Sequence, residues 1–297
     1  MMRLTFLRLA GLLLACLAVA CASSSERPAN SRTDFRFAAW PGPMLRVFAV
    51  EPDGLAADAP VVIVMHGVGR NADEYRDNWV DLAEHYGLRV YVPEFSKQDF
   101  PGAEHYNLGG IGTGKPRAYG AIEPLFRYVQ DKRGVTAPSY VIFGHSAGAQ
   151  YVHRFVCFAE PEHMAFAISA NAGWYTLPST DEAWPYGLGG IPEGECTPKA
   201  WLQQPVLVML GDKDIDPADP SLRHTPEADR QGPYRMARGL YFMDVAAAEA
   251  AALDVPLAWQ VRTVPGVAHD NRGMALAAAP LIASLGQETD TTGEDAQ

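Results

Sequence analysis

Short apolar runs alternate with amphipathic segments along most of this 297-residue chain. Six runs rich in Val, Ile, Leu and Phe predict strands, at Val61–Met65, Arg89–Val92, Tyr140–Phe143, Phe166–Ser169, Val206–Leu210 and Leu257–Val264. Segments with helical periodicity lie between them, at Ala72–Tyr86, Ala118–Asp131, Ala147–Phe158, Met236–Leu253 and Asn271–Leu285. Strands that are buried on both faces read as continuous apolar runs. The alternation therefore predicts an α/β domain with a mostly parallel sheet and helices on both faces.

The two ends of this pattern are less regular. Two short alternating segments, residues 35–39 and 45–50, predict a hairpin around the turn sequence WPGP. The acidic, Thr-rich segment 287–297 has no apolar periodicity and predicts a disordered tail. A chain of this length holds one large core, so we expect a single domain over residues 34–286.

Residues 1–20 have the composition of an export signal. Arg3 and Arg8 form a basic n-region, and an apolar run follows from Leu9 to Ala20 with no acidic residue. A run of about twelve apolar residues is too short to span a bilayer as a stable helix. We therefore expect export, with the first segment removed.

The end of this signal has two interpretations. The sequence LAVAC is typical of a bacterial lipobox and predicts lipidation of Cys21, followed by a tether over residues 21–33. The sequence LLAC, ending at Cys16, is a weaker lipobox. The small residues at 18–20 also suit an ordinary signal peptidase. The expected location is the bacterial cell envelope, by a lipid anchor, or otherwise the periplasm or the medium.

Charge and cysteine content limit the expected partners. The formal net charge is −11, which argues against nucleic acid and anionic polymers as partners of the surface. The sequence gives no reason to expect a metal or cofactor, and a membrane contact is expected only through the anchor. Outside the signal, Cys157 and Cys196 could form a disulfide in an oxidising compartment. The alternative is a buried thiol at Cys157 and an unrelated loop thiol at Cys196.

A serine stands where a predicted strand turns directly into a predicted helix. In the sequence GHSAG, Gly144 and Gly148 leave room for a strained corner, which would expose Ser146 above the sheet. A serine hydroxyl is a weak nucleophile without a base to take its proton. The alternative is an ordinary helix N-cap serine.

Two later loops carry residues that complement this serine. The loop GDKDIDP follows a strand and offers Asp212, Asp214 and Asp216, which could instead form a solvated acidic loop or a cation site, although no distal glutamate follows. His269 alone among eight histidines follows the last predicted strand. A surface histidine is the alternative, but the order Ser, Asp, His suits a serine hydrolase of this class.

The loop HGVG after the first parallel strand could present backbone amides to a developing oxyanion. We expect the amides of Val68 and Ala147 to serve there. The same loop matches the dinucleotide-binding pattern G-x-G-x-x-A, with Glu94 near the end of the next strand. That alternative leaves Ser146, Asp214 and His269 unexplained.

Together, MHGVGRNADEY, GHSAGA, GDKDIDP and PGVAHD make the chain resemble an α/β-hydrolase, and more narrowly the secreted polyhydroxybutyrate depolymerase and feruloyl esterase group. The resemblance covers residues 45–285. It implies Ser146 as nucleophile, His269 as base and Asp214, three residues after a glycine and three before a proline, as the orienting acid. It also implies no metal or cofactor. We expect no separate domain for binding an insoluble polymer.

The substrate pocket is expected in the loops beside these residues. A long Pro/Gly-rich insertion, residues 171–201, follows a strand, and we expect Trp174 and Tyr175 to wall the pocket. Its other two large aromatics, Trp184 and Tyr186, are expected to form a small core of the loop itself. We also place His66, Gly67 and His145 at the pocket, and we expect the polar loop 215–234 to form a solvent-facing flap.

The predicted function is hydrolysis of a small or oligomeric carboxylic ester through an acyl-enzyme intermediate. A peptidase or amidase, or an acyltransferase, of the same fold shares these residues. An alternative of another class is a surface lipoprotein that uses the fold as a binding scaffold without turnover. The oligomeric state is not predicted.

Overall fold

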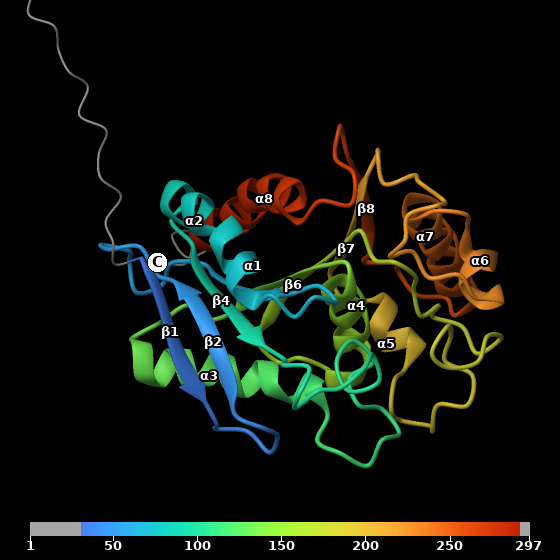
Figure 1. Cartoon of the computed structure of the whole chain (residues 1–297), viewed down its shortest axis with the longest axis horizontal. Helices are drawn as coiled ribbons and strands as arrows, with labels where there is room; N and C mark the ends of the chain where they lie inside the picture. The colour runs from blue at the N-terminus through green and yellow to red at the C-terminus, as the bar shows by residue number, and fades with distance from the viewer. Residues whose placement is uncertain (1–30, 292–297) are drawn as a thin grey trace, which may run out of the picture.

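A computed structural model describes residues 31–291 of the chain. Within them, one eight-stranded sheet has the order β1-β2-β4-β3-β5-β6-β7-β8 (Figure 1). The strands are β1 (Arg32–Phe37), β2 (Leu45–Val50), β3 (Val61–Met65), β4 (Arg89–Glu94), β5 (Tyr140–His145), β6 (Met164–Ala170), β7 (Val206–Gly211) and β8 (Gln260–Val264). β1 and β2 form the predicted hairpin, β2 runs antiparallel to β4, and all other pairs are parallel. The predicted α/β fold with a mostly parallel sheet is confirmed.

Helices cover both faces of the sheet. The helices are α1 (Ala72–Asn78), α2 (Val80–Tyr86), the 3-10 helix η1 (Ala118–Ala121), α3 (Ile122–Arg133), α4 (Ala147–Ala159), α5 (Pro198–Leu202), α6 (Pro226–Gln231), α7 (Arg235–Ala252) and α8 (Asn271–Thr291). α1, α2 and α8 lie on one face, at the top of Figure 1, and α3, α4, α5 and α7 pack on the other. Alternation along β3 divides the two cores, because Val62 and Val64 face the first set while Ile63 and Met65 face the second.

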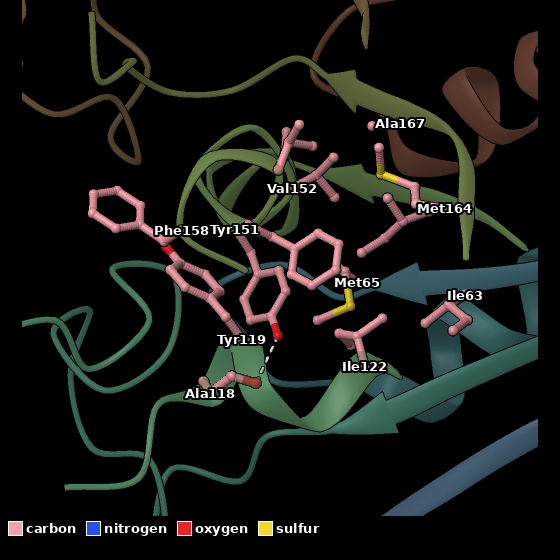
Figure 2. Packing of buried hydrophobic residues seen from close by; sticks show 14 of the residues in the cluster. Ile63, Met65, Ala118, Tyr119, Ile122, Tyr151, Val152, Phe158, Met164 and Ala167 are labelled. Carbon is pink, nitrogen blue, oxygen red and sulfur yellow. Dashed lines mark hydrogen bonds between the residues drawn. The ribbon is translucent and has the colours of Figure 1, made fainter. Parts of the chain in front are cut away.

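The second core surrounds α4, the helix that follows Ser146. Figure 2 shows Tyr151 and Val152 of α4 among side chains of β3, η1 and β6. The hydroxyl of Tyr151 donates a hydrogen bond to the carbonyl of Ala118 over 2.8 Å, which satisfies a polar group that burial would otherwise leave unpaired. The helix is buried along almost its whole length, so its first residue has a fixed place.

Several boundaries differ from the sequence prediction, and β1 begins at Arg32, within the predicted tether. The first predicted helix breaks at Trp79, whose fully buried ring packs 5.2 Å from that of Phe143. β8 begins at Gln260, because Trp259 packs its indole against Trp201 and so the start of the apolar run joins the helical layer. α8 continues to Thr291, so residues 287–291 of the predicted tail are helical.

The predictions for the two ends of the chain concern mostly residues that the structure does not describe. Cys16 and Cys21 of the predicted signal lie outside the described residues, and so does the tail after residue 291. Among the residues that are described, we find no helix with the length and apolar character needed to cross a membrane.

Cys157 of α4 and Cys196, which precedes α5, form a disulfide with Cα atoms 5.2 Å apart, as one of the two interpretations expected.

Candidate active site

Ser146 occupies the sharp turn between β5 and α4. Its φ of 59° and ψ of −117° form a conformation that non-glycine residues rarely adopt. The turn depends on close backbone approach, since a Cβ at Gly144 would overlap the carbonyl of Gly148, and a Cβ at Gly148 would overlap the carbonyl of Met65. The two glycines of GHSAG therefore have the role that the sequence predicted, and Ser146 stands at the carboxyl end of the sheet.

The structure brings Ser146, His269 and Asp214 together from three separate loops. Nδ1 of His269 lies 2.8 Å from Oδ2 of Asp214, and Nε2 lies 3.0 Å from Oγ of Ser146. A carboxylate can only accept a hydrogen bond, so Nδ1 carries the proton and Nε2 of the neutral ring accepts from the serine hydroxyl. This arrangement can remove a proton from Ser146 and return it to a leaving group.

Asp214 has a second charged partner, Arg235 at the start of α7. Nη1 of Arg235 donates to Oδ1 of Asp214 over 3.1 Å and to Asp219 over 3.0 Å, and Nη2 donates to Oγ of Ser221 over 2.7 Å. The pKa of the Asp219 carboxyl is held well below its usual range, chiefly by the hydrogen bond from Arg235. Arg235 therefore links the loop that carries Asp219 and Ser221 to the buried acid.

Asn171 joins the two loops that carry Asp214 and His269. Its Nδ2 donates to the carbonyl of Ala268 over 2.9 Å, and its Oδ1 accepts from the amide of Gly211 over 2.8 Å. Its φ is 51°, a left-handed conformation that asparagine tolerates better than most residues. The side chain thus fixes the spacing between the ends of β7 and β8.

His145 lies beside the candidate base rather than in the pocket wall. Its ring centroid is 4.6 Å from that of His269, and its Nδ1 lies 3.1 Å from the hydroxyl of Tyr75. Burial lowers the pKa of His145 well below its usual value, and repulsion from His269 when it is protonated and from Arg235 acts in the same direction. The ring is therefore neutral at neutral pH and adds no fixed charge next to His269.

The two amides predicted for the oxyanion site border the same space as Ser146. Val68 and Ala147 both line this pocket. Among the described residues, the Val68 amide has no hydrogen-bond acceptor, and the Ala147 amide lies in the first turn of α4, where a helix offers no acceptor. Gly67 allows the loop to pass close to Tyr75, because a Cβ there would lie 2.6 Å from the tyrosine hydroxyl.

The pocket beside Ser146 has a volume of about 200 Å³. Its lining comes from the loops after β3, β4, β6 and β7 and from the starts of α4 and α7: Val68, Ala103, Asn107, Ser146, Ala147, Gln150, Gly173, Trp174, Ser221, Arg223 and Arg235. The predicted pocket residue Trp174 is among them. The loop 215–234 contributes Ser221 and Arg223, so this segment borders the site and is more than a solvent-facing flap.

Four predicted pocket residues lie elsewhere. His66 is fully buried beneath the site, where its ring stacks on Tyr106 and its Nε2 accepts from the amide of Phe95, and burial lowers its pKa to about 3. Tyr175 is also fully buried, with its ring stacked on Phe242. His145 and Gly67 support the site from behind, as described above. Adjacent residues in the irregular segment 171–197 point in different directions, and its sequence has no period that would reveal this.

The other aromatic residues of the insertion belong to a small cluster that is separate from the two main cores. Tyr186 packs with its ring 4.6 Å from that of Trp174, and both are buried in this cluster with Leu108 and Ala228. Trp184 packs against the same cluster and also against Phe158 of α4. The expected small core is therefore present, although residues outside the insertion contribute to it, and Tyr186 supports the pocket wall.

Several residues of the site were not identified from the sequence. Arg70 donates to the carbonyls of Phe95, Phe100 and Gly102 and so orders the long segment after β4 that carries Asn107. Asn107 donates to Oε1 of Gln150 over 2.6 Å in the pocket lining. A long segment with few apolar residues between β4 and η1 was the available signal for Asn107, whereas no sequence signal distinguished Arg235 from the other arginines.

Comparison with known proteins gives matches only among solved structures. No protein-family model matches the chain, and no curated protein does. The chain is similar to poly(aspartic acid) hydrolase-1 from Sphingomonas sp. KT-1, with 39% identity, 85% of this chain and 98% of that chain covered, and a TM-score of 0.81. It is also similar to LpqC, a poly(3-hydroxybutyrate) depolymerase from Bordetella parapertussis, with 32% identity, 84% and 89% covered, and a TM-score of 0.75. The fluorophosphonate-binding serine hydrolase FphF from Staphylococcus aureus, at 17% identity, 86% and 98% coverage and a TM-score of 0.56, shares the fold alone.

Proposed function

This chain belongs to the α/β-hydrolase family, among the hydrolases that resemble poly(3-hydroxybutyrate) depolymerases, and we propose that it is a serine hydrolase of carboxylic esters. The observation that carries the proposal is the chain of hydrogen bonds from Asp214 through His269 to Ser146, with the serine held in a strained turn. The pocket beside Ser146 is small and partly apolar, which suits a short acyl or aryl group.

The reaction takes place in two steps. His269 takes the proton of Ser146 as the hydroxyl attacks the ester carbonyl, and the amides of Val68 and Ala147 stabilise the oxyanion. The resulting imidazolium gives its proton to the leaving alcohol, which departs and leaves an acyl group on Ser146. His269 then activates water, which attacks the acyl carbonyl and regenerates the serine. Asp214 holds the ring in the required tautomer and stabilises its positive charge.

The test is hydrolysis of 4-nitrophenyl esters of increasing acyl length by the wild-type protein and Ser146→Ala. The expected result is loss of at least about ten-thousandfold in kcat for the variant, since the nucleophile is removed while the rest of the site remains. Ser139→Ala is a matched control, because Ser139 directly precedes β5 at the opposite end of that strand. Equal rates for Ser146→Ala and the wild type would refute the assignment of the nucleophile.

A second candidate function is hydrolysis of amides by the same residues. The observation that favours it is the 39% identity to a protein described as a poly(aspartic acid) hydrolase, because poly(aspartic acid) is a polyamide. Matched 4-nitroanilides and 4-nitrophenyl esters of one acyl group separate the two, since an esterase hydrolyses only the ester at an appreciable rate. An acyltransferase would form product with an added alcohol in preference to water.

A scaffold without turnover is the alternative of another class. A fluorophosphonate probe distinguishes it, because an activated Ser146 reacts covalently with the probe whatever the natural substrate. Labelling of the folded protein, lost in Ser146→Ala, supports an active hydrolase. Absence of labelling in both proteins would favour the scaffold.

Export and lipid anchoring are part of the proposal and rest on residues 1–21 alone. Intact mass of the protein from its native membrane fraction tests them. A mass increase of three acyl chains and a glyceryl group on a chain that begins at Cys21, lost in Cys21→Ser, supports the anchor. An unmodified chain that begins at Cys21 or later would instead indicate a free exported protein.

A further inference from the structure

Two guanidinium groups contact the ring of Trp174, the aromatic residue that lines the pocket with Ser146. The guanidinium carbon of Arg154 lies 4.3 Å from the ring centroid, and that of Arg223 lies 5.2 Å from it. Arg154 belongs to α4 and Arg223 to the segment after β7, so the ring gathers two cations from distant parts of the sequence. The face of the indole ring attracts each cation, but the two like charges still repel each other, and a nearby anion would relieve this repulsion.

Within residues 31–291, no acidic side chain forms an ion pair or hydrogen bond with Arg154. It is fully buried, and its acceptors are all neutral: the hydroxyl of Thr176 at 2.7 Å and the carbonyls of Asn107 and Gln150 at 3.2 and 3.0 Å. Its Nη2 has no hydrogen-bond partner among the described residues. Burial lowers its pKa to about 10, and the charge of Arg223 contributes in the same direction, so the group remains a cation at neutral pH.

Arg223 is exposed and lies at the edge of the pocket. It forms no ion pair with an acid in residues 31–291. The charge of Arg223 makes only a minor contribution to the lowered pKa of Glu227. Its backbone is held in place, because Arg238 donates to its carbonyl over 2.9 Å and the neighbouring Leu222 is buried. An ordered backbone thus presents a free cation to the pocket.

We propose that the end of the pocket at Trp174 binds a carboxylate group of the substrate, with Arg223 as the specificity residue that contacts it. A guanidinium offers several donors in a plane that matches a carboxylate. Arg154 lies under the same ring and adds positive potential without touching the substrate. Arg235 also lines the pocket, but Asp214 and Asp219 neutralise it.

This inference names the substrate class of the proposed hydrolase and rests on that function. The net charge of −11 led to the expectation that anionic partners are disfavoured, but this charge describes the whole chain and not the pocket. Potentials near a pocket depend on the nearest charges, particularly where low-dielectric walls focus them. A substrate with a single carboxylate can therefore be favoured at the pocket although the chain as a whole carries a net negative charge.

The experiment compares substrates that differ only in charge. On the acyl side they are 4-nitrophenyl hydrogen adipate and pimelate against their methyl esters, and on the leaving-group side 4-acetoxybenzoate against its methyl ester. The value of kcat/KM is measured for each pair with the wild-type protein and Arg223→Gln. Intrinsic reactivity cancels when one pair is compared between proteins. The matched control is Arg36→Gln, which removes an exposed arginine from the edge strand β1.

The expected result is that Arg223→Gln lowers the preference for the charged member of a pair by about five- to tenfold, the range for a partly exposed charged contact. Arg36→Gln keeps the wild-type preference. Added NaCl reduces the preference in the wild type, because the Debye length is about 10 Å at 0.1 M. A preference that is absent from every pair, or one that Arg223→Gln retains, would overturn the inference.

Failure of the proposed function is recognised separately. If the wild type hydrolyses the neutral methyl esters, the hydrolase proposal stands whatever the charge preference. If it hydrolyses none of the esters, calorimetric titration with adipate and with adipamide still tests the carboxylate site. Tighter binding of adipate that is lost in Arg223→Gln supports the site, and equal binding of the two compounds overturns it.

Discussion

Arg235 and Asp214 form a buried ion pair at the centre of the candidate site. Their side chains are 2% and 4% exposed, and Nη1 of Arg235 lies 3.1 Å from Oδ1 of Asp214. The other carboxylate oxygen faces His269, so the two oxygens have separate partners. In addition, the amide of Met236 donates to the carbonyl of Asp214 over 3.2 Å. The start of α7 therefore fixes both the backbone and the side chain of the acid that orients the base.

Arg235→Met is expected to lower kcat by about ten- to a hundredfold, with a smaller effect on KM for a neutral ester, because the main loss is the orientation of the acid. Removal of one partner of a buried ion pair should also lower the free energy of unfolding by about 3–5 kcal/mol. Arg235→Lys should restore part of kcat, since an ammonium keeps the charge without the planar geometry. Initial rates and urea unfolding measure the two effects.

A control for this prediction lies three residues further along α7. Arg238 is also buried, but it contacts Asp229 and backbone carbonyls rather than Asp214. Arg238→Met should therefore lower stability with a smaller loss of kcat on a neutral ester. Equal losses of kcat in Arg235→Met and Arg238→Met would show that Arg235 acts only through stability.

Asn171 offers a pair of substitutions that separate its side chain from its backbone. Asn171→Ala and Asn171→Gly both remove the hydrogen bonds to Gly211 and Ala268, so both should lower kcat by about tenfold. Only alanine is strained at a φ of 51°, and it should be less stable than glycine by about 1 kcal/mol. Rates and thermal unfolding test this, and a wild-type kcat in Asn171→Gly would show that the side chain does not position the loops.

Buried neutral histidines should make the fold sensitive to acid. Burial lowers the pKa of His66 to about 3 and that of His145 and His153 well below the usual value. Because these pKa values are depressed in the folded state, their stabilising contribution is complete above the unfolded value of about 6.5 and is lost as the pH falls toward the folded values. Each of these buried histidines should lower the free energy of unfolding by about 1.4 kcal/mol per pH unit as the pH falls below about 6.5.

Urea unfolding at a series of pH values from 7.5 to 5 measures this slope. A free energy of unfolding that stays constant between about pH 6.5 and 5 would contradict the prediction.

The disulfide between Cys157 and Cys196 joins α4 to the segment before α5, 39 residues later in the chain. Closure of a loop of this length should stabilise the fold by roughly 2–4 kcal/mol. Replacement of both cysteines by serine is expected to lower the melting temperature, while ester hydrolysis at low temperature is retained because neither residue lines the pocket. The double variant should not respond to a reductant, whereas the wild type should. An unchanged melting temperature in the variant would indicate that the bond contributes nothing.

The sequence alone specified the elements whose physics is local. Apolar runs and helical periods located every parallel strand, and the glycines of GHSAG identified the turn at Ser146, because only small neighbours permit that backbone. The order of loops along the chain then predicted His269 and the loop that carries the acid, and the resemblance to α/β-hydrolases selected Asp214 among the three aspartates of that loop. A parallel sheet forces this meeting, since all its loops of one kind emerge at the same edge.

Only the tertiary structure decided which polar residues support these three. Arg235, Asn171 and the pair Arg154 and Arg223 act across 20 or more residues of sequence. Their partners are a carboxylate, backbone groups and an aromatic ring, and no spacing in the sequence reveals them. Trp174 and Tyr175 illustrate the same limit, because one lines the pocket and its neighbour is buried in the core. A strand or helix imposes a period that tells the two faces apart, whereas in an irregular loop the direction of each side chain is set by packing against the rest of the fold.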